Sequence, residues 1–504
     1  MAKQYKKISQ NSICRIVVVA VCLAAQVAWF VWQVFLLNNG NGGVALLTEI
    51  LALLLILRIN YKNVNFSMKM PWIMLLMAFP VLGLCLYGLT ELLGDLGVGK
   101  RLQKVRQDLR QCSANNEDSL PDHVAGQCRY LSQCVGYPVY ANTAVNYYAE
   151  AADAFADLKK ALQQAEHFIF MEYFIIEDGS SFAEVEQILV RKAAEGVQVR
   201  LMYDDIGSVG TTNMRLIARL RKQGIHCIPF NPAVPMLHLF MNHRDHRKIT
   251  VVDGKVAFTG GFNLADEYFG RTRPYGHWKD TGLRLEGAAV QAMTSIFLEL
   301  WSVQTRQQED FSVYLQASSD VSAPGYVQPF GDDPLGEERV AENVYLNLIH
   351  SAKQRLYLVT PYLIITDEMT HALTMAAGRG VDVRILTPGI PDKKMVYQIT
   401  QSYYAALVTK GVRIFTYTPG FCHAKMCLCD DHVATVGTSN LDYRSLYHHF
   451  ENNVLLVDVP AIAEIASDFE SMFACSREET RCCRSVGFFL RIWRYILRLF
   501  APLL

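Results

Sequence analysis

The sequence predicts a mixed α/β protein built from two similar halves that follow an apolar N-terminal region. Short apolar strands such as HFIFMEYFI and RLYLVTPYLI alternate with helix-like segments, a pattern typical of α/β layers. Parts of the pattern occur twice, since Glu195–Leu201 resembles Gly380–Leu386 and Gln223–Pro229 resembles Lys410–Thr416. The 504 residues, 51% of them hydrophobic, are enough for two domains and additional membrane segments.

Two N-terminal runs have the length of a membrane span. Ile16–Leu37 and Trp72–Leu89 could each cross the roughly 30 Å hydrocarbon layer, and we interpret both as transmembrane helices. Between them, Val44–Ile59 is short and carries Glu49, so a span, a re-entrant segment and an interfacial helix remain open, and we favour a span. No small-residue cleavage site follows the first run, so we expect an uncleaved anchor.

Basic residues near these runs bear on membrane orientation. They form three groups: Lys3, Lys6, Lys7 and Arg15; Arg58, Lys62 and Lys69; and Lys100, Arg101, Lys104, Arg106 and Arg110. Two spans would keep the first and last groups in the cytoplasm and three would not, so the positive-inside rule conflicts with the favoured third span. We expect the rest of the chain to be cytoplasmic.

Charge and cysteine content argue against a nucleic-acid-binding protein and against a cysteine metal site. Lys plus Arg and Asp plus Glu are equal at 48 each, so the basic excess that usually accompanies non-specific nucleic-acid binding is missing. We therefore expect no nucleic-acid partner. The 13 cysteines show no paired metal-ligand spacing, and Cys427 and Cys429 alternate along an apparent strand as small buried hydrophobic residues would.

These patterns divide the chain into five segments. They are a membrane anchor with two or three transmembrane helices over 1–100, a helical linker over 101–144, two α/β domains over 145–325 and 326–480, and a C-terminal helix over 481–504. The first domain carries a ten-residue insertion within Asn231–Asn242, which could be a lid, a lip for lipid access or an ordinary packed loop.

The C-terminal segment predicts a basic amphipathic helix. Arg491, Arg494 and Arg498 share one helical face, with the apolar side chains largely elsewhere. Such helices commonly lie in an anionic membrane surface. A terminal helix docked on the globular domain is the alternative.

A motif with the form His-x-Lys-x4-Asp occurs twice, as HRKITVVD from His246 and as HAKMCLCD from His423. Aligned at a fixed offset of 177, the nineteen residues from each histidine are identical at eight positions. Most of these identities are polar residues or glycine, so core packing does not explain them. A single copy would be a chance surface pattern, but the repetition indicates that each copy supplies half of one active site.

The motif also has a readable geometry. The pattern of strand, Asp253-Gly254 turn and returning strand predicts a tight hairpin, with His246 and Lys248 on one face. Asn263 follows in the first copy and Asn440 in the second, after small residues whose backbone N–H groups can approach an anion. Two histidines, two lysines and two amides are what phosphoryl transfer through a covalent intermediate requires, without a metal or other cofactor.

With these motifs the chain resembles the phospholipase D superfamily, from about Val145 to Ser476. The N-terminal spans, the phrases MEYFIIEDG and HWKDTGLRLEG and the basic tail are similar to those of the bacterial cardiolipin synthases. The resemblance implies two phospholipase D-like domains in a pseudo-twofold arrangement that share one active site. It also implies a multi-pass enzyme of the bacterial inner membrane that transfers a phosphatidyl group between two phosphatidylglycerol molecules and releases glycerol, with anionic membrane lipids as partners.

The resemblance also implies a role for each site residue. His246 is expected to be the nucleophile and His423 the acid and later the base, an assignment that the symmetry leaves open to reversal. Lys248, Lys425, Asn263 and Asn440 are expected to hold the phosphate, and Asp280 and Glu451 to orient the histidines. Asp253 and Asp430 complete the catalytic motifs, although their position at hairpin turns fits a structural hydrogen-bonding role equally well.

Other functions fit the same residues. Water in place of a lipid alcohol would make the protein a membrane-bound phospholipase D that hydrolyses headgroups, and phosphatidylethanolamine could replace phosphatidylglycerol. A membrane-tethered nuclease or an inactive scaffold fits less well, because of the neutral charge and the intact motifs. His448 and His449 beside Glu451 could suggest a metal site, but no second cluster with ligand spacing accompanies them, and we expect no metal. The oligomeric state is left open.

Overall fold

The computed structural model describes residues 32, 42–92, 97–110, 120–209, 214–232, 243–307, 309–315, 321–480, 487–499 and 501–503. The chain divides into an N-terminal unit, described over 42–92, and a main unit that begins at Gly97 and contains both motifs. The expected span Ile16–Leu37 falls outside the described residues except for Trp32, and most of the Asn231–Asn242 insertion also falls outside them.

The N-terminal unit consists of helices α2 (Gly42–Tyr61), α3 (Phe66–Ala78) and α4 (Pro80–Leu92). Of the helices in the described ranges, only α2, over Gly43–Tyr61, has the length and composition to span a membrane. The prediction of one continuous helix over Trp72–Leu89 is wrong. Pro80 disfavours helical backbone at the residue before it, and the chain breaks there into two shorter helices.

The first half of the main unit is a seven-stranded mixed sheet. In spatial order its strands are β1 (Thr143–Tyr148), β9 (Gly282–Gly287), β7 (Val256–Gly260), β6 (Lys248–Val252), β2 (Phe168–Tyr173), β3 (Gln198–Asp204) and β4 (His226–Phe230). Its helices are α7 (Ala151–Gln163), α8 (Ser180–Ala194), α9 (Met214–Lys222) and α10 (Val290–Thr305). A short 3-10 helix, η4 (Asp266–Phe269), follows β7.

The second half repeats this topology. Its sheet runs β10 (Tyr326–Asp332), β17 (His449–Val457), β16 (Val433–Gly437), β15 (Met426–Cys429), β11 (Arg355–Val359), β12 (Asp382–Pro388), β13 (Arg413–Tyr417) and β18 (Ser476–Glu478). Its helices are α11 (Val340–Ser351), α12 (Asp367–Gly378), α13 (Lys394–Val408), α14 (Tyr443–Tyr447) and α15 (Ala461–Ala474). Apart from the extra edge strand β18, the strand order matches that of the first half, which confirms the predicted α/β repeat.

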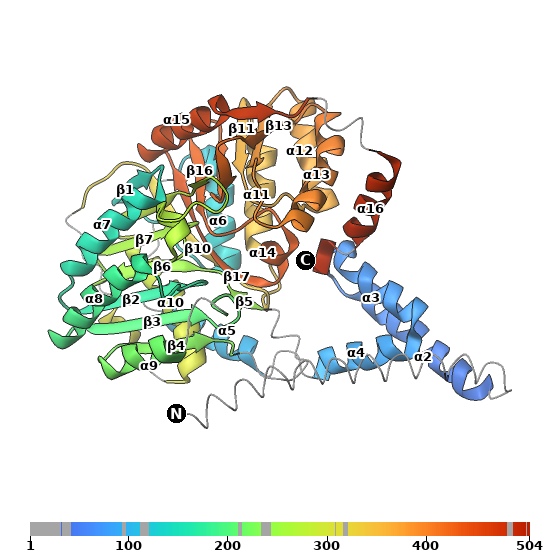
Figure 1. The fold of residues 1–504 in the computed structure, drawn as a ribbon, viewed down its shortest axis with the longest axis horizontal. Coiled ribbons are helices and arrows are strands. Elements are labelled where there is room, and N and C mark those ends of the chain that lie inside the picture. The colour runs from blue at the N-terminus through green and yellow to red at the C-terminus, as the bar shows by residue number, and fades with distance from the viewer. Residues whose placement is uncertain are drawn as a thin grey trace. The chain divides into compact units, whose positions relative to one another are not determined.

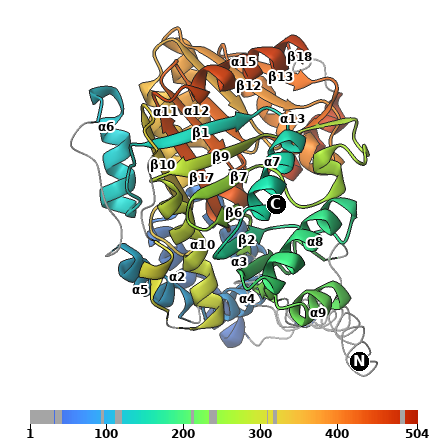
Figure 2. The ribbon, with the colours of Figure 1, turned by 90° about the vertical axis from the view of Figure 1, so that its left-hand side faces the viewer.

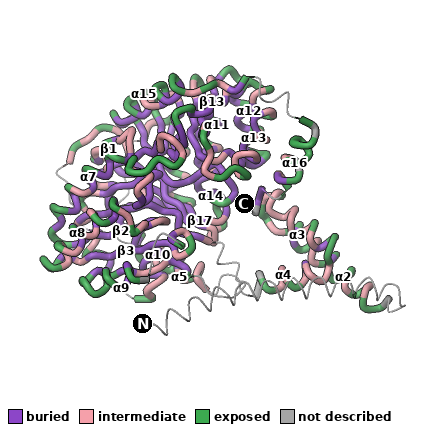
Figure 3. The backbone as a smooth tube through the Cα atoms, in the orientation of Figure 1, coloured by how far each residue is buried: buried purple, intermediate pink, exposed green. Residues whose placement is uncertain are grey.

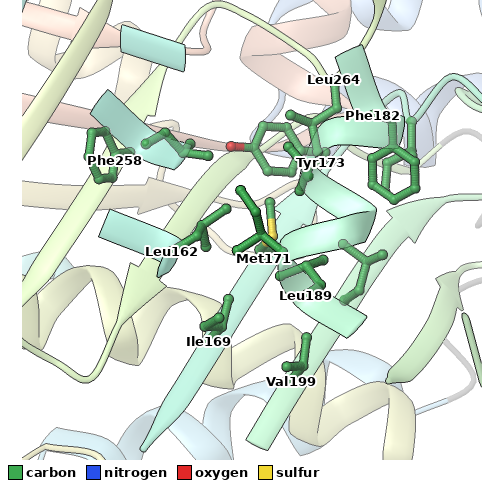
Figure 4. Packing of buried hydrophobic residues seen from close by; sticks show 14 of the residues in the cluster. Leu162, Ile169, Met171, Tyr173, Phe182, Leu189, Val199, Phe258 and Leu264 are labelled. Carbon is green, nitrogen blue, oxygen red and sulfur yellow. The ribbon is translucent and has the colours of Figure 1, made fainter. Parts of the chain in front are cut away.

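The two halves lie side by side, the first in green and the second in orange and red (Figures 1 and 2). Their central strands are buried (Figure 3), including Cys427 and Cys429 of β15, as their alternation predicts. In the first half, β2 and β3 pack against α7 and α8 through apolar side chains that include Met171, Leu189 and Val199 (Figure 4). Two rigid sheets of this kind can hold side chains at fixed positions.

Shorter segments flank the repeat. The linker forms α5 (Val98–Arg110), α6 (Asp122–Arg129) and a π-helical turn, Tyr130–Val135. Arg106 of α5 forms ion pairs with Glu299 of α10 and with Asp333, so the linker is attached to both halves. Two-residue and three-residue strands, β5 (Arg244–Asp245), β8 (His277–Lys279) and β14 (Gly420–Cys422), lie outside the two main sheet paths.

The C-terminal helix α16 (Phe488–Leu499) docks on α13. Arg494 donates to the Gln401 side chain (2.6 Å), and the Arg498 guanidinium lies 4.2 Å from the centre of the Tyr403 ring. These two arginines are thus packed against α13, as the alternative of a docked terminal helix predicts. Instead, the apolar face is the exposed one, with Phe489 85% and Ile496 43% accessible.

Candidate active site

Two short parallel strand pairs join the halves of the main unit. β5 of the first half pairs with the start of β17, and β14 of the second half pairs with β8. β5 and β17 are adjacent in Figure 1. Each pair leads directly into a motif histidine: His246 follows β5 and donates its backbone N–H to Phe450 O (2.9 Å), and His423 follows β14 and donates to Lys279 O (2.7 Å). The same local structure thus occurs twice, with the halves exchanged.

These strand pairs place each histidine beside a carboxylate of the other half. The Nδ1 atom of His246 lies 3.0 and 2.9 Å from the two carboxylate oxygens of Glu451. The Nδ1 atom of His423 lies 2.7 Å from an Asp280 oxygen. All four side chains are buried. The sequence analysis identified both carboxylates but did not predict that each one contacts the histidine of the other half, a pairing that we call crossed.

The crossed pairs fix the tautomer of both imidazoles. An ionised carboxylate only accepts hydrogen bonds, so Nδ1 carries the proton in each histidine and Nε2 keeps its lone pair. Burial, reinforced by Lys248 and Lys425, holds the pKa of His246 well below its usual range. Burial and Lys425 lower the pKa of His423 to about 4, against the opposing effect of Asp280. Both imidazoles are therefore neutral in the unliganded cavity at neutral pH.

The two lysines lie next to the histidines. Lys248 Nζ donates to the backbone carbonyl of His246 (2.5 Å), and Lys425 Nζ donates to that of His423 and lies 2.8 Å from its Nδ1. Burial lowers the pKa of Lys248 to about 7 and that of Lys425 to about 8. Nearby carboxylates raise both pKa values and so limit the effect of burial. A bound phosphate anion would stabilise both ammonium groups in the same way.

The histidines and both asparagines line one cavity of about 740 Å³. Asn263 Oδ1 accepts from the backbone N–H of Ile175 (3.1 Å), and its amide donates to the Tyr268 hydroxyl (2.8 Å), which leaves one amide N–H for a ligand. Asn440 Oδ1 is buried and finds no partner in the described part of the chain. Gly261 leaves room for the Asp280 carboxylate, which a Cβ atom would meet.

Asp253 and Asp430 are placed differently. Each lies in a hairpin turn with left-handed backbone (φ 53° and 50°). The Asp253 carboxylate accepts from the backbone N–H groups of Glu166, His167 and Phe168, each at 2.8 Å. Asp430 accepts from those of residues 353–355. Neither residue lines the cavity. These contacts favour the structural role that the hairpin position also allowed, in which each carboxylate holds the start of the central strand of its half.

The sequence analysis did not single out Tyr268 or Trp278, and it considered His449 only as a metal ligand. Tyr268 and Trp278 lie 5.3 and 5.6 Å from His423 between ring centres, and His449 lies 5.4 Å from His246. Trp278 and His449 each stand two residues before a histidine-orienting carboxylate, and this shared spacing was the signal that could have found them.

His246, His449 and Glu451 also offer metal-ligand atoms within 4.8 Å of one another. His449 is buried, and neither of its ring nitrogens has a hydrogen-bond partner in the described ranges. The ligand types suit zinc. However, the ammonium groups of Lys248 and Lys425 act on His246 and oppose the entry of a dication.

Comparisons with known proteins identify the family to which both halves are similar. The family model described as "Cardiolipin synthase, PLD-like domain" matches residues 158–301 and 345–473. An uncharacterised protein of Streptococcus mutans is 41% identical over 86% of this chain and 96% of its own length. A cardiolipin synthase of Halalkalibacterium halodurans is 32% identical over 88% of this chain and 90% of its own.

Among solved structures, a phosphatidylserine synthase of Haemophilus influenzae matches 75% of this chain and 98% of its own, with a TM-score of 0.57 and 14% identity. At this identity the likeness concerns the fold.

Proposed function

The chain belongs to the cardiolipin synthase family of phospholipase D-like proteins, and from this premise we propose how its two halves perform the reaction. It is a phosphatidyltransferase, and its activity is that of a cardiolipin synthase. We propose phosphatidylglycerol as both donor and acceptor. The observation that carries the mechanism is the pair of crossed histidine–carboxylate contacts, which gives one cavity two oriented imidazoles from opposite halves.

In the first step, Nε2 of His246 attacks the phosphorus of phosphatidylglycerol. The bond to the glycerol oxygen breaks, and that oxygen takes a proton from Nε2 of His423. Attack places positive charge on the His246 imidazole, which Glu451 stabilises through Nδ1–H. The incoming phosphate anion favours the protonated form of His423 that this step needs, because opposite charge raises the pKa of an imidazole. Lys248 and Lys425, which are buried behind the histidines and do not line the cavity, stabilise the charge on the non-bridging oxygens through their electrostatic field.

In the second step, His423 acts as the base. It takes the proton from a glycerol hydroxyl of a second phosphatidylglycerol, whose oxygen attacks phosphorus as the bond to His246 Nε2 breaks. The products are cardiolipin and the free enzyme. The proton given to the first glycerol is thereby recovered, so the cycle needs no cofactor. Two ammonium groups supply the positive charge that a metal ion provides in other phosphoryl transferases.

We infer that the enzyme lies in the bacterial cell membrane, with the main unit in the cytoplasm. Helix α2 supports one span, and the run Ile16–Leu37 supports a second by its sequence. Two spans satisfy the positive-inside rule, with α3 and α4 as shorter segments that do not cross. Labelling of single cysteines in intact cells would test this, because label at position 40 from outside and none at position 120 is expected.

The function is tested with the purified full-length protein in phosphatidylglycerol nanodiscs, with lipid products followed by mass spectrometry. Cardiolipin and one equivalent of glycerol are expected, and both should be lost in His246→Ala and His423→Ala. Phosphatidic acid as the sole product would identify water as the acceptor and overturn the transferase mechanism. A second preparation with added phosphatidylethanolamine tests the identity of the donor. Release of ethanolamine in preference to glycerol would show that phosphatidylethanolamine, and not phosphatidylglycerol, is the donor.

A further inference from the structure

The two catalytic histidines have different surroundings, although the halves have the same fold. His423 is flanked by the rings of Tyr268 and Trp278 from the first half. His246 is flanked by His449 at 5.4 Å and by Phe174 at 5.0 Å. The fold would allow the same residue at both equivalent positions. Trp278 and His449 thus give the two sides of the cavity different chemistry.

The side of the cavity near His423 and the side near His246 also differ in charge. Glu267 of η4 and Arg444 of α14 are 177 residues apart, the offset of the two motif histidines, and both line the cavity. The Glu267 carboxylate acts electrostatically on Tyr268, whose ring lies 5.3 Å from that of His423, so it lies on the same side of the cavity as His423. No side chain of another described residue bonds that carboxylate, and burial raises the pKa of Glu267. A half-buried carboxylate beside aromatic rings is suited to a ligand that donates hydrogen bonds and has an apolar edge.

We propose that Glu267, Tyr275 and Trp278 form a polyol subsite beside His423 that binds the glycerol of phosphatidylglycerol. This inference rests on the proposed function and specifies its headgroup site. Glu267 accepts a hydrogen bond from the central hydroxyl, and the rings of Tyr275 and Trp278, 6.1 Å apart, pack against the carbon chain. The outer oxygen then lies at Nε2 of His423, where it takes or gives its proton.

One subsite serves both steps because the same chemical group leaves and enters. The departing glycerol and the acceptor glycerol each keep a central hydroxyl, and both must place an outer oxygen between phosphorus and His423. A cationic headgroup would also be attracted by Glu267. However, Lys248, Lys425 and Lys393 all act on His246 and oppose a further positive charge near it, which favours a neutral headgroup.

The test compares glycerol with 1,3-propanediol, which differs only by lacking the central hydroxyl. The full-length enzyme is loaded from phosphatidyl-p-nitrophenol, whose leaving group has no central hydroxyl to bond Glu267, and both alcohols are supplied at equal concentration. Wild type should form phosphatidylglycerol in excess, and Glu267→Gln should lower the product ratio by about tenfold, as expected for the loss of one hydrogen bond to a charged group. The ratio comes from one reaction mixture, so it does not depend on how much variant folds.

Arg444→Gln is the matched control at the equivalent position of the other half, and its product ratio should equal that of wild type. An unchanged ratio in Glu267→Gln, or an equal fall in Arg444→Gln, would overturn the subsite. Ethanolamine, supplied as a third alcohol, tests whether the site binds a cationic headgroup instead. If wild type formed more phosphatidylethanolamine than phosphatidylglycerol, the site would be one for a cation. Failure of the proposed function can be told apart from failure of the subsite, since the enzyme would then form no cardiolipin from phosphatidylglycerol alone.

Discussion

Replacing Glu451 with glutamine should prevent His246 from acting as the nucleophile while leaving the fold intact. The carboxylate is fully buried and lies 2.9 Å from His246 Nδ1. Glutamine has the same shape but no charge, so it cannot stabilise the cation that forms when Nε2 attacks phosphorus. At that separation the lost attraction is about 6 kcal/mol for an effective dielectric constant of about 20. We expect the rate of phosphohistidine formation to fall by about 10⁴-fold.

The assay uses phosphatidyl-p-nitrophenol, which releases a coloured product without help from an acid. Wild type should give a burst equal to the enzyme concentration, and Glu451→Gln should give none. Asp280→Asn is the matched control, because it weakens only the support of His423 and should keep the burst while slowing later turnover. The opposite pattern, a burst in Glu451→Gln and none in Asp280→Asn, would show that His423 attacks and would refute the assignment. Circular dichroism of both variants checks folding.

Three further predictions concern other parts of the molecule. Asp430→Asn should lower the free energy of unfolding by about 2 kcal/mol in urea titrations, because a charged acceptor of backbone N–H groups is lost, while kcat of the folded enzyme stays unchanged. The KM for lipid should rise as pH increases from about 7 to about 8, because Lys248 and Lys425 lose their positive charge in that range, and Lys248→Arg should move this rise to higher pH in steady-state assays. Phe489→Ser should reduce activity in nanodiscs more than in detergent micelles if the exposed face of α16 contacts lipid; equal effects would refute that contact.

The sequence predicted the α/β repeat and the motif residues because both depend on local patterns. Alternating apolar residues and a fixed offset of 177 are visible without any tertiary structure. The crossed pairing was not visible, because it depends on β5 and β14, strands of two and three residues that pair with the opposite half. Strands this short carry no periodicity.

The errors have local physical causes. Trp72–Leu89 is apolar throughout, so its hydropathy hid the break that Pro80 imposes. For α16 the sequence left a lipid surface and a docked position open, because the partners that Gln401 and Tyr403 offer on α13 are not displayed by a linear sequence. For Asp253 and Asp430, the hairpin turn was recognised, while the backbone N–H groups they bind come from a strand about 80 residues earlier in the chain.

The crossed carboxylates also control when activity can begin during synthesis. His246 leaves the ribosome long before Glu451 does, and until then its imidazole has no partner to hold the attacking tautomer. His423 emerges after Asp280, but it cannot act on a phosphohistidine that has not formed. Under the proposed assignment of roles, a nascent or truncated chain that lacks Glu451 is therefore expected not to cleave lipid.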